Sequence, residues 1–417
     1  MSAPRRIVLV NAWHDDNKGD GGIIEATLDL LEPHAPGAEV TVVSKFTRAH
    51  PAFASAHRHL LARRPDIRVL PLGSGMGVAA GRVARLRRAV GWMLPRRAEE
   101  AERAIAAADL VVSVGGHYLY NRRADPRHWG RLDRHLHPLR VAGRAGVPYV
   151  LLAQSVGPFS DRLSRRMTRR VLSRARAVGL REARSDAVLA ALGVPADRRF
   201  VIPDVAFALQ PEHTPAVGAA LRRHGLDGVF WAFTVRGWGT GAQSDAFLDE
   251  MADAVRGVLR AGLADRVALV AHCHGPTADE DDRVATRRLA ERLAGEPVAV
   301  VDEDLAPREL VALYGRAAAV VGTRFHSVIF ALAAGTPAYA VAYFGPKAQG
   351  IMEMLDMSDL CSDTASFRAA EALPRMRRLV EPAHRDAVRE RVAALRVELR
   401  RAVAARVMGT APAAEGR

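Results

Sequence analysis

Apolar runs without polar alternation recur along almost the whole chain, separated by longer amphipathic stretches. Runs of about four to eight apolar residues are typical of strands in a parallel sheet that helices cover on both faces. In the first half, strands are predicted at 6–11, 39–44, 109–115, 147–154, 177–181 and 199–202, with helices such as 22–31, 161–176 and 185–192 between them. This alternation predicts an α/β fold.

The second half of the chain repeats this pattern after a stretch rich in Pro, His and Arg. Strands are predicted at 228–235, 266–271, 298–301, 318–322 and 337–342, and helices at 244–261, 281–293 and 328–334. We therefore expect two doubly wound domains that face each other across a cleft. The predicted parts are an N-terminal domain at 1–209, a linker at 210–226, a C-terminal domain at 227–380, and a C-terminal helix with a frayed tail at 381–417.

The positive charge of the chain is almost entirely arginine. The 417 residues carry a formal net charge of +14, and of the 60 basic residues 57 are arginine and three are lysine. Together with abundant Ala, Gly and Val, this skew is typical of codon bias toward G and C. Only 6% of the residues are aromatic, which does not favour stacking platforms for nucleic acid. We expect no nucleic-acid partner, and an acidic small substrate fits the charge equally well.

Targeting and redox features are sparse. The two cysteines, Cys273 and Cys361, are too few for a disulfide framework or a cysteine-based zinc site. The start has no cleavable signal sequence, and no run of about 18 apolar residues occurs, so a cytoplasmic protein is predicted. The basic segment 81–97 contains a Trp-Met-Leu run and no acid. It is either a peripheral contact with the inner face of an anionic membrane or an ordinary helix with a solvated arginine face. The oligomeric state is not indicated.

Glycine and polar residues follow the predicted strands of the first half, where ligands of open α/β sheets bind. Glycines let the backbone approach a ligand, and the N–H groups at a helix start suit an anion. Asp20 would repel an anion, so it is expected to cap the helix or bind a hydroxyl. The segment 154–159 is predicted to be a rigid turn with two side chains facing the cleft. The candidate binding residues are Asn17, Gly19, Asp20, Gly115, Gly116, His117, Gln154, Ser155, Gly157, Arg181 and Asp204, and for each a tight turn, a helix cap or an ion pair is the alternative.

The most informative stretch, Thr323-Arg324-Phe325-His326-Ser327, ends a strand and opens a helix. Arginine binds phosphate or carboxylate through two parallel hydrogen bonds, and histidine donates a proton near neutral pH. With the backbone donors of the helix start, Arg324 and His326 suit acid catalysis on a bound anion, and Thr323 and Ser327 are candidate binding residues.

Other candidate residues follow the remaining strands of the second half. Lys347, shortly after Tyr343, is the last of the three lysines, and a lysine retained against the arginine bias is predicted to be functional. Arg236 ends another strand. His272 and His274 would share a face of an extended strand, a spacing that suits two metal ligands. No third ligand is evident nearby, so hydrogen bonding or packing is expected there rather than a metal site.

In these residues the chain resembles the polysaccharide pyruvyl transferase family, particularly its colanic-acid-type members. The matching pieces occur in family order from about residue 10 to 355, nearly the whole chain. They are Asn17-x-Gly19-Asp20, Gly115-Gly116, Gln154-Ser155-Val156-Gly157-Pro158-Phe159, Arg181-Glu182 with Ser185, Pro203-Asp204, Gly275 with Asp281-Asp282, Thr323-Arg324-Phe325-His326-Ser327, and Tyr343 with Lys347. His117 stands where the family often has a third glycine, at a place where an acceptor could bind.

The resemblance implies two Rossmann-like doubly wound domains, similar to the glycosyltransferase B-type fold. It implies transfer of the pyruvyl (carboxyethylidene) group of phosphoenolpyruvate to a saccharide, a lipid-linked saccharide or a glycosylated metabolite, forming a ketal and releasing phosphate. His326 is the implied general acid. Arg324, Arg181 and Lys347 are the implied donor-binding cations, with Arg236 as a further helper. The scheme requires no metal and no cofactor.

Two other functions agree with parts of the sequence. A sugar-nucleotide-dependent glycosyltransferase would also use a cleft between two domains. A non-catalytic module that binds an anionic surface would use the segment 81–97 and the arginine-rich C-terminus, but it gives no role to the polar strand ends.

Overall fold

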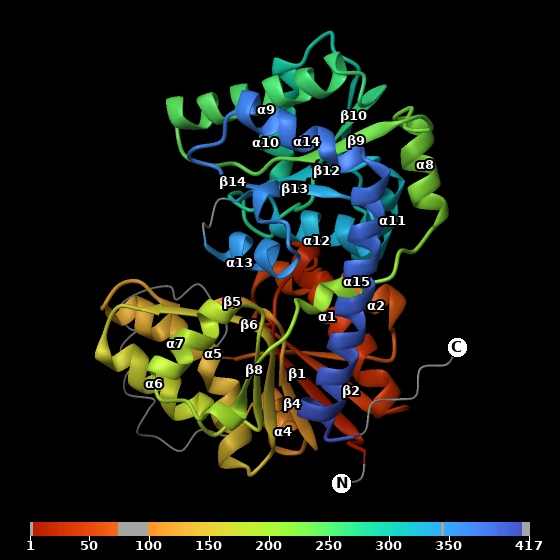
Figure 1. Ribbon diagram of the computed structural model, residues 1–417. Helices are drawn as coiled ribbons and strands as arrows, with labels where there is room; N and C mark the ends of the chain where they lie inside the picture. The colour runs from red at the N-terminus through yellow and green to blue at the C-terminus, as the bar shows by residue number, and fades with distance from the viewer. Residues whose placement is uncertain (1–2, 74–98, 343–345, 411–417) are drawn as a thin grey trace.

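The computed structural model describes residues 3–73, 99–342 and 346–410, and the side chains of residues 346–348 are outside this description. The chain forms two α/β units, each built around a parallel sheet with helices on both sides (Figure 1). Within the described residues, the N-terminal unit has an eight-stranded sheet in the order β3-β2-β1-β4-β6-β7-β8, with β5 paired to β6 outside this order. The C-terminal unit has a six-stranded sheet in the order β11-β10-β9-β12-β13-β14.

The strand bounds follow the predicted apolar runs closely. The strands are β1 (Arg6–Ala12), β2 (Glu39–Ser44), β3 (Arg68–Pro71), β4 (Leu110–Ser113), β5 (Gly116–Asn121), β6 (Tyr149–Phe159), β7 (Ala177–Leu180), β8 (Arg199–Val201), β9 (Phe230–Thr234), β10 (Arg266–Val270), β11 (Val298–Val301), β12 (Ala319–Gly322), β13 (Ala338–Ala342) and β14 (Cys361–Asp363).

The connections between strands are mostly helical. The α-helices are α1 (Lys18–Leu31), α2 (Arg58–Arg63), α4 (Glu100–Ala106), α5 (Pro126–Arg144), α6 (Arg162–Leu172), α7 (Ala183–Ala191), α8 (Pro215–Arg223), α9 (Ala242–Arg260), α10 (Asp282–Arg292), α11 (Pro307–Arg316), α12 (Phe325–Ala333), α13 (Pro346–Met354), α14 (Ala369–Arg377) and α15 (Pro382–Ala402). Short 3₁₀ segments are η1 (Glu32–His34), η2 (Pro51–Phe53), η3 (Ala196–Arg198), η4 (Val205–Ala208), η5 (Ser358–Leu360) and η6 (Arg378–Val380), and α15 runs into the π-helical segment η7 (Val403–Met408).

The strand order of both sheets is that of a Rossmann-type doubly wound fold, which confirms the predicted fold class. In each sheet the chain order reverses beside the first strand, between β1 and β4 in one sheet and between β9 and β12 in the other. Ligands of such sheets bind in the crevice at the carboxyl ends of these strands. The two crevices therefore mark where a site is expected.

Alternate residues of the central strands are buried on opposite faces of the sheet, which explains the continuous apolar runs. Ile7 and Leu9 of β1 pack into one apolar cluster, and Val8 and Val10 pack into the other. Helices α4 and α5 cover the second face, and α1 covers the first. The period-two geometry of a strand makes both faces apolar when helices lie on both sides.

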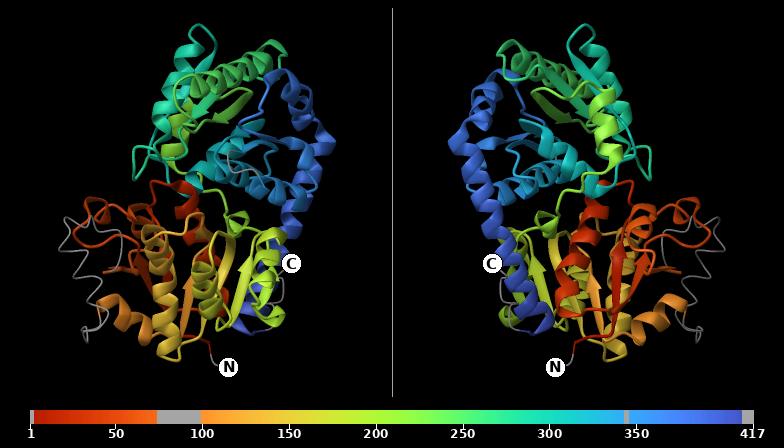
Figure 2. Two further views of the ribbon diagram at one scale, coloured as in Figure 1. Left: turned by 90° about the vertical axis from the view of Figure 1, so that its left-hand side faces the viewer. Right: turned by 90° about the vertical axis from the view of Figure 1, so that its right-hand side faces the viewer.

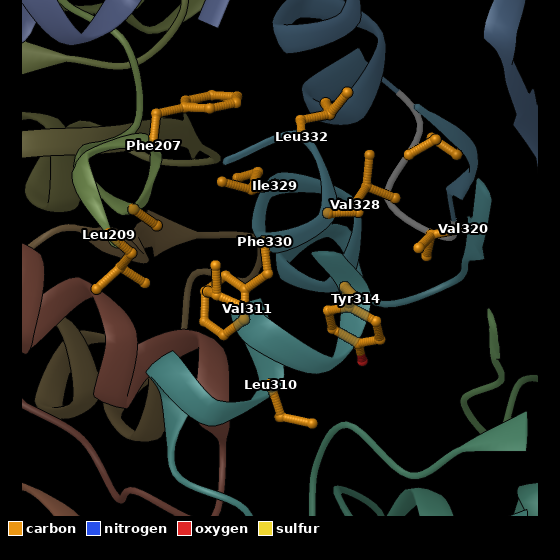
Figure 3. Packing of buried hydrophobic residues seen from close by; sticks show 14 of the residues in the cluster. Phe207, Leu209, Leu310, Val311, Tyr314, Val320, Val328, Ile329, Phe330 and Leu332 are labelled. Atoms are coloured by element: carbon orange, nitrogen blue, oxygen red, sulfur yellow. The ribbon is translucent and has the colours of Figure 1, made fainter. Parts of the chain in front are cut away.

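The apolar core continues from one sheet to the other. A single buried cluster contains residues of both units, joined through η4, α1 and α12. Figure 3 shows Phe207 of η4, the adjacent Leu209, and Ile329 and Phe330 of α12 around this junction. Gly22 of α1 lies so close to Phe330 that a Cβ at position 22 would come nearer than 3.0 Å to the ring. The glycine thus allows α1 and α12 to pack at short range.

The C-terminal helix crosses from the C-terminal unit back to the N-terminal one (Figure 2). Arg396 of α15 donates hydrogen bonds to the carbonyl oxygens of Phe207, Leu209 and Ala333, at 2.9, 3.0 and 2.6 Å. Further on, η7 packs against α1, and the guanidinium of Arg406 donates to the Asp197 carbonyl at 2.7 Å. The predicted C-terminal helix is therefore present and ties the two units together.

The predicted turn at 154–159 is wrong. These residues continue β6 to Phe159, because β5 offers them a parallel partner beyond the end of β4. Within the predicted linker 210–226, residues 215–223 form α8, which packs against α11. The domain boundaries themselves stay predictions. The segment 81–97 lies outside the described residues, and no helix within the described ranges is long and apolar enough to cross a bilayer.

Candidate functional site

A cleft of about 490 Å³ opens at the carboxyl ends of the strands where the chain order reverses in both sheets. The residues that line it come from both units. They are Asn11, Trp13, Asn17, Asp20, Lys45, Leu72, Val114, Gly115, Gly116, His117, Tyr118, Tyr120, Arg122, Arg131, Arg134, His135, Arg181, Arg236, His272, Glu280, Thr323, Arg324, Phe325, His326, Ala342 and Ile351. The position agrees with the crevice rule for open α/β sheets.

Arg324 enters the cleft from the end of β12, immediately before α12. Its guanidinium donates two hydrogen bonds to Oδ1 of the buried Asp282 carboxylate, from Nε at 2.9 Å and from Nη2 at 2.8 Å. Nη2 also donates to the carbonyl oxygen of Glu280 at 2.7 Å. Asp282 in turn accepts the backbone N–H of Cys273 at 3.0 Å. Arg324 is thus held rigidly at the cleft wall by a buried acid.

His326 lies in the first turn of α12 and faces the cleft. Its Nε2 atom is 3.8 Å from Oδ2 of Asp204 and has no hydrogen-bond partner among the residues that the structure describes. The imidazole packs on α1, where a Cβ at position 19 would come nearer than 3.0 Å to three atoms of the His326 side chain. Gly19 therefore lies beneath His326 and makes room for the imidazole.

Replacement of Gly19 by alanine is expected to displace His326. Where a displaced side chain takes part in a reaction, a shift of about 1 Å lowers the rate by about 10²-fold. The imidazole has little freedom to move, because the overlap includes its own Cβ. Initial rates and the unfolding midpoint of Gly19→Ala would be measured beside those of Gly130→Ala. Gly130 of α5 has open space for a Cβ, so this control should keep full activity. Full activity of Gly19→Ala would contradict the assigned packing.

Arg181 belongs to a buried ion pair behind His326. Its Nη1 atom donates to Oδ2 of Asp204 at 2.6 Å, and Nε donates to Oγ of Ser155 at 2.7 Å. Burial acts to raise the pKa of Asp204, but the charges of Arg181 and His326 outweigh it and hold this pKa well below its usual range. Asp204 is therefore an anion at neutral pH that faces both the guanidinium and the imidazole. Ser155 also donates to Glu182 at 2.9 Å and so fixes the guanidinium from the other side.

Two further carboxyl groups line the cleft, and the pKa of each is raised. Burial raises the pKa of Asp20, with partial compensation from His326. Burial, and next the charge of Asp20, raise the pKa of Glu280 to about 7. The carboxyl group of Glu280 can therefore exchange a proton near neutral pH, and perturbed pKa values of this kind gather at functional sites.

The N-terminal wall of the cleft carries a buried lysine. Lys45 follows β2, and its Nζ atom lies 2.6 and 2.9 Å from the two ring nitrogens of His135. Nζ also lies 5.6 Å from the ring centre of Tyr118 and 6.0 Å from that of Trp13. Burial, followed by the charges of Arg134 and Arg131, lowers the pKa of Lys45 to about 7.

Many of the predicted site residues do meet at the cleft. Its lining includes Asn17, Asp20, Gly115, Gly116, His117, Arg181, Arg236, Thr323, Arg324 and His326. Of the remaining predictions, Tyr343 lies outside the described residues, and so does the side chain of Lys347, whose backbone is in α13.

Other predicted residues support the lining residues from behind. Gln154 is buried and donates to Tyr118 Oη at 2.6 Å. The carbonyl oxygen of Gly157 lies 2.8 Å from Nε2 of His117, and Oγ of Ser327 donates to the Arg324 carbonyl at 2.6 Å. Gln154 and Ser155 were predicted to face the cleft, but neither lines it. Gln154 contacts Tyr118, and Ser155 lies between Glu182 and Arg181.

His272 and His274 do not share one face, as strand alternation would require. The strand β10 ends at Val270, so both follow it in irregular chain. His272 lines the cleft, with Nδ1 3.1 Å from Tyr314 Oη. His274 lies among interdomain ion pairs, 3.8 Å from Asp304, which also accepts from Lys18 Nζ at 2.5 Å. Within residues 3–73, 99–342 and 346–410 no group of three His, Cys, Asp or Glu side chains is placed to hold a metal ion.

Sequence reasoning missed most of the N-terminal wall. Lys45 was available as one of three lysines and follows a predicted strand, but it lacks a recognisable motif. Arg131, Arg134 and His135 share one face of α5, whose start is marked by the Asp125-Pro126 cap. The spacing of these three residues could be seen in the sequence. Because arginine is so abundant in this chain, the spacing did not distinguish a binding site from an ordinary solvated helix face.

The polysaccharide pyruvyl transferase family model matches residues 17–345. A curated relative, the amylovoran biosynthesis protein AmsJ of Erwinia amylovora, is 24% identical over 393 residues, which is 87% of this chain and 89% of that protein.

Solved structures show the same fold. A putative UDP-N-acetylglucosamine 2-epimerase from Listeria monocytogenes superposes with a TM-score of 0.58 at 12% identity, covering 97% of this chain and 96% of that one. Anabaena Alr3699/HepE in complex with UDP and glucose gives 0.56 at 14% identity, with 95% of each chain covered. At these identities the likeness concerns the fold alone.

Proposed function

The chain belongs to the polysaccharide pyruvyl transferase family, and from this membership we propose that it transfers the pyruvyl group of phosphoenolpyruvate to a saccharide acceptor, forming a ketal and releasing phosphate. A pyruvyl transfer role in polysaccharide biosynthesis follows from the family. The donor and the roles of individual residues are the proposal. The observation that carries it is the convergence of Arg324, His326 and the Arg181–Asp204 pair at one cleft.

The donor is a small molecule with a phosphate and a carboxylate, so its binding requires several cations. Arg324 and Arg181 are already oriented by Asp282 and Asp204, respectively, so little conformational entropy is lost when they bind an anion. Lys347 and Arg236 are proposed as further donor-binding cations. No cofactor is required by this scheme.

His326 is proposed to donate a proton to the methylene carbon of phosphoenolpyruvate, which becomes the methyl group of the product. The neighbouring carbon becomes an oxocarbenium centre, and one sugar hydroxyl attacks it and loses its proton. The C–O bond to phosphate then breaks as the second hydroxyl attacks and loses its proton. Two hydroxyl protons are released and two are consumed, one by the methyl group and one by the departing phosphate. The depressed pKa of Asp204 keeps an anion 3.8 Å from the Nε2 atom of the imidazole.

Phosphoenolpyruvate is expected to stabilise the protein against heat, by about 2.7 kcal/mol at 100-fold excess over Kd. Arg324→Ala should weaken donor binding roughly tenfold or more, because charge-assisted hydrogen bonds are lost. Each ligand-induced shift in melting temperature is compared with the same variant without ligand, since the substitution also leaves Asp282 unpaired. Arg166→Ala, at an exposed position of α6, is the matched control.

A nucleoside diphosphate sugar would be titrated in parallel. Stabilisation by that ligand, with no response to phosphoenolpyruvate in the presence or absence of candidate saccharides, would replace the proposal by a sugar-nucleotide-dependent glycosyltransferase.

A further inference from the structure

One wall of the cleft carries more positive charge than the proposed donor chemistry uses. Arg131 and Arg134 of α5 line it, and Lys45 reaches it from the end of β2. These residues come from other elements than Arg324 and His326, which belong to the start of α12. The two groups of cations therefore form separate parts of one cleft.

Lys45 has an environment that is unusual for a lysine in a protein interior. No carboxylate of the described residues lies within 4.0 Å of its Nζ atom. The printed partners are the ring nitrogens of His135 and the faces of Tyr118 and Trp13. A buried cation without an acid is costly unless another anion neutralises it.

The neighbouring arginine is also incompletely satisfied. Nη1 of Arg131 donates to Tyr120 Oη at 2.9 Å, and the guanidinium lies 4.2 Å from the centre of that ring. The buried Nε atom of Arg131 has no hydrogen-bond partner among the residues that the structure describes. His117 packs against the same tyrosine, with ring centres 4.7 Å apart.

We propose that Lys45, Arg131 and Arg134 bind an oxyanion of the acceptor, a carboxylate or a phosphate, so that the acceptor is an acidic saccharide. The proposal rests on the proposed function, because it assigns the donor to Arg324 and Arg181. The rings of Trp13, Tyr118 and Tyr120 line the cleft beside these cations. Asp20 interacts electrostatically with both Lys45 and His326, and it marks the border between the acceptor part and the donor part.

The affinity of this part of the cleft for an oxyanion is expected to fall as the pH rises. The charged groups that act on Lys45 are Arg134 and Arg131 from α5, which lower its pKa, and Asp20 from α1, which raises it. His135 of α5 also faces the amine, and burial holds its own pKa well below the usual value, so this imidazole is neutral. Burial, followed by the charges of Arg134 and Arg131, lowers the pKa of Lys45 to about 7. An anion favours the protonated amine, so its binding raises this pKa, and its affinity falls as the pH rises through about 7.

The scarcity of lysine makes the test direct. Protein labelled with ¹³C at lysine Cε gives signals from only three side chains, and Lys45→Arg identifies one of them by its loss. Glucuronate and glucose 1-phosphate are the carboxylate and phosphate probes, and glucose is the neutral control. The expected result is that one or both acidic sugars shift the Lys45 signal and raise its pKa, with phosphoenolpyruvate already bound, while glucose does not. The acidic sugar that binds with the higher affinity shows whether the oxyanion of the acceptor is a carboxylate or a phosphate.

Substitution separates this proposal from the proposed function. Arg131→Met should weaken binding of the acidic sugar roughly tenfold or more and leave stabilisation by phosphoenolpyruvate unchanged, and Arg166→Met should alter neither. The inference is overturned if neither acidic sugar moves the Lys45 signal, or if saturating phosphoenolpyruvate abolishes the shift. Absence of donor binding with intact binding of the acidic sugar would instead overturn the proposed donor.

Discussion

Replacement of His326 by glutamine is expected to reduce turnover by about 10²–10⁴-fold, the usual contribution of a general acid, with little change in the affinity for phosphoenolpyruvate. Glutamine keeps a polar side chain of similar reach but cannot deliver a proton. The cations proposed to hold the donor, Arg324 and Arg181, keep their own partners in the variant. Turnover is measured as phosphate release with a saccharide acceptor, and donor affinity as the thermal shift with phosphoenolpyruvate.

His213→Gln provides the control for this substitution, because His213 is an exposed histidine away from the cleft. It should retain full turnover. If His326→Gln also turned over at the rate of the unaltered protein, His326 would not be the acid, and Glu280, whose pKa is raised to about 7 by burial and the charge of Asp20, would be the next group to substitute.

Asp204→Leu is expected to lower the free energy of unfolding by about 3–5 kcal/mol, because it removes the closer of the two acids that neutralise the buried guanidinium of Arg181 and leaves only Glu182, 3.9 Å from Nε. Asp204 also caps η4 by accepting the backbone N–H of Ala206 at 3.0 Å. The measurement is the unfolding midpoint in urea. Since the pKa of Asp204 is depressed in the folded state, its stabilising contribution is complete above the unfolded-state pKa of about 4 and is lost as the pH falls below it.

A second substitution tests the reason for this loss. Arg181→Met combined with Asp204→Leu removes both charges and should recover much of the stability, since an apolar pair of similar volume often replaces a buried ion pair at little cost. Asp249→Leu breaks an exposed ion pair with Arg292 and should cost no more than about 1 kcal/mol. Equal losses from Asp204→Leu and Asp249→Leu would show that burial of the first pair does not determine its contribution.

The sequence predicted the sheets well where strands are apolar on both faces. The bounds predicted for β2 and β11 agree with the structure residue for residue. The strands β3, β5 and β14 were missed because they are short or lie at or near sheet edges and contain polar residues, as in Cys361–Asp363. The extension of β6 was missed because Gly157-Pro158 is ordinarily a turn signal, and only pairing with β5 keeps it extended.

The site was predicted where a motif coincided with a strand end, as at Arg324 and His326. It was missed where function depends on which helix face meets the cleft. Arg131 and His135 of α5 differ from dozens of surface arginines and histidines only in their orientation, which the packing of α5 on β5 decides. Similarly, the role of Gly19 was attributed to a ligand, whereas the atom that approaches it belongs to His326, more than 300 residues away in sequence.

The return of the C-terminal helix to the N-terminal unit bears on how the chain folds as it is synthesised. The last strand of the first sheet, β8, ends at Val201, and η7, which packs against α1 of the same unit, begins at Val403. At translation rates of about 5–20 residues per second, roughly 10–40 s separate the two on the ribosome. During that interval the surface of α1 that η7 later covers is not yet covered by it. We expect the nascent first unit to bind chaperones until the final helix arrives.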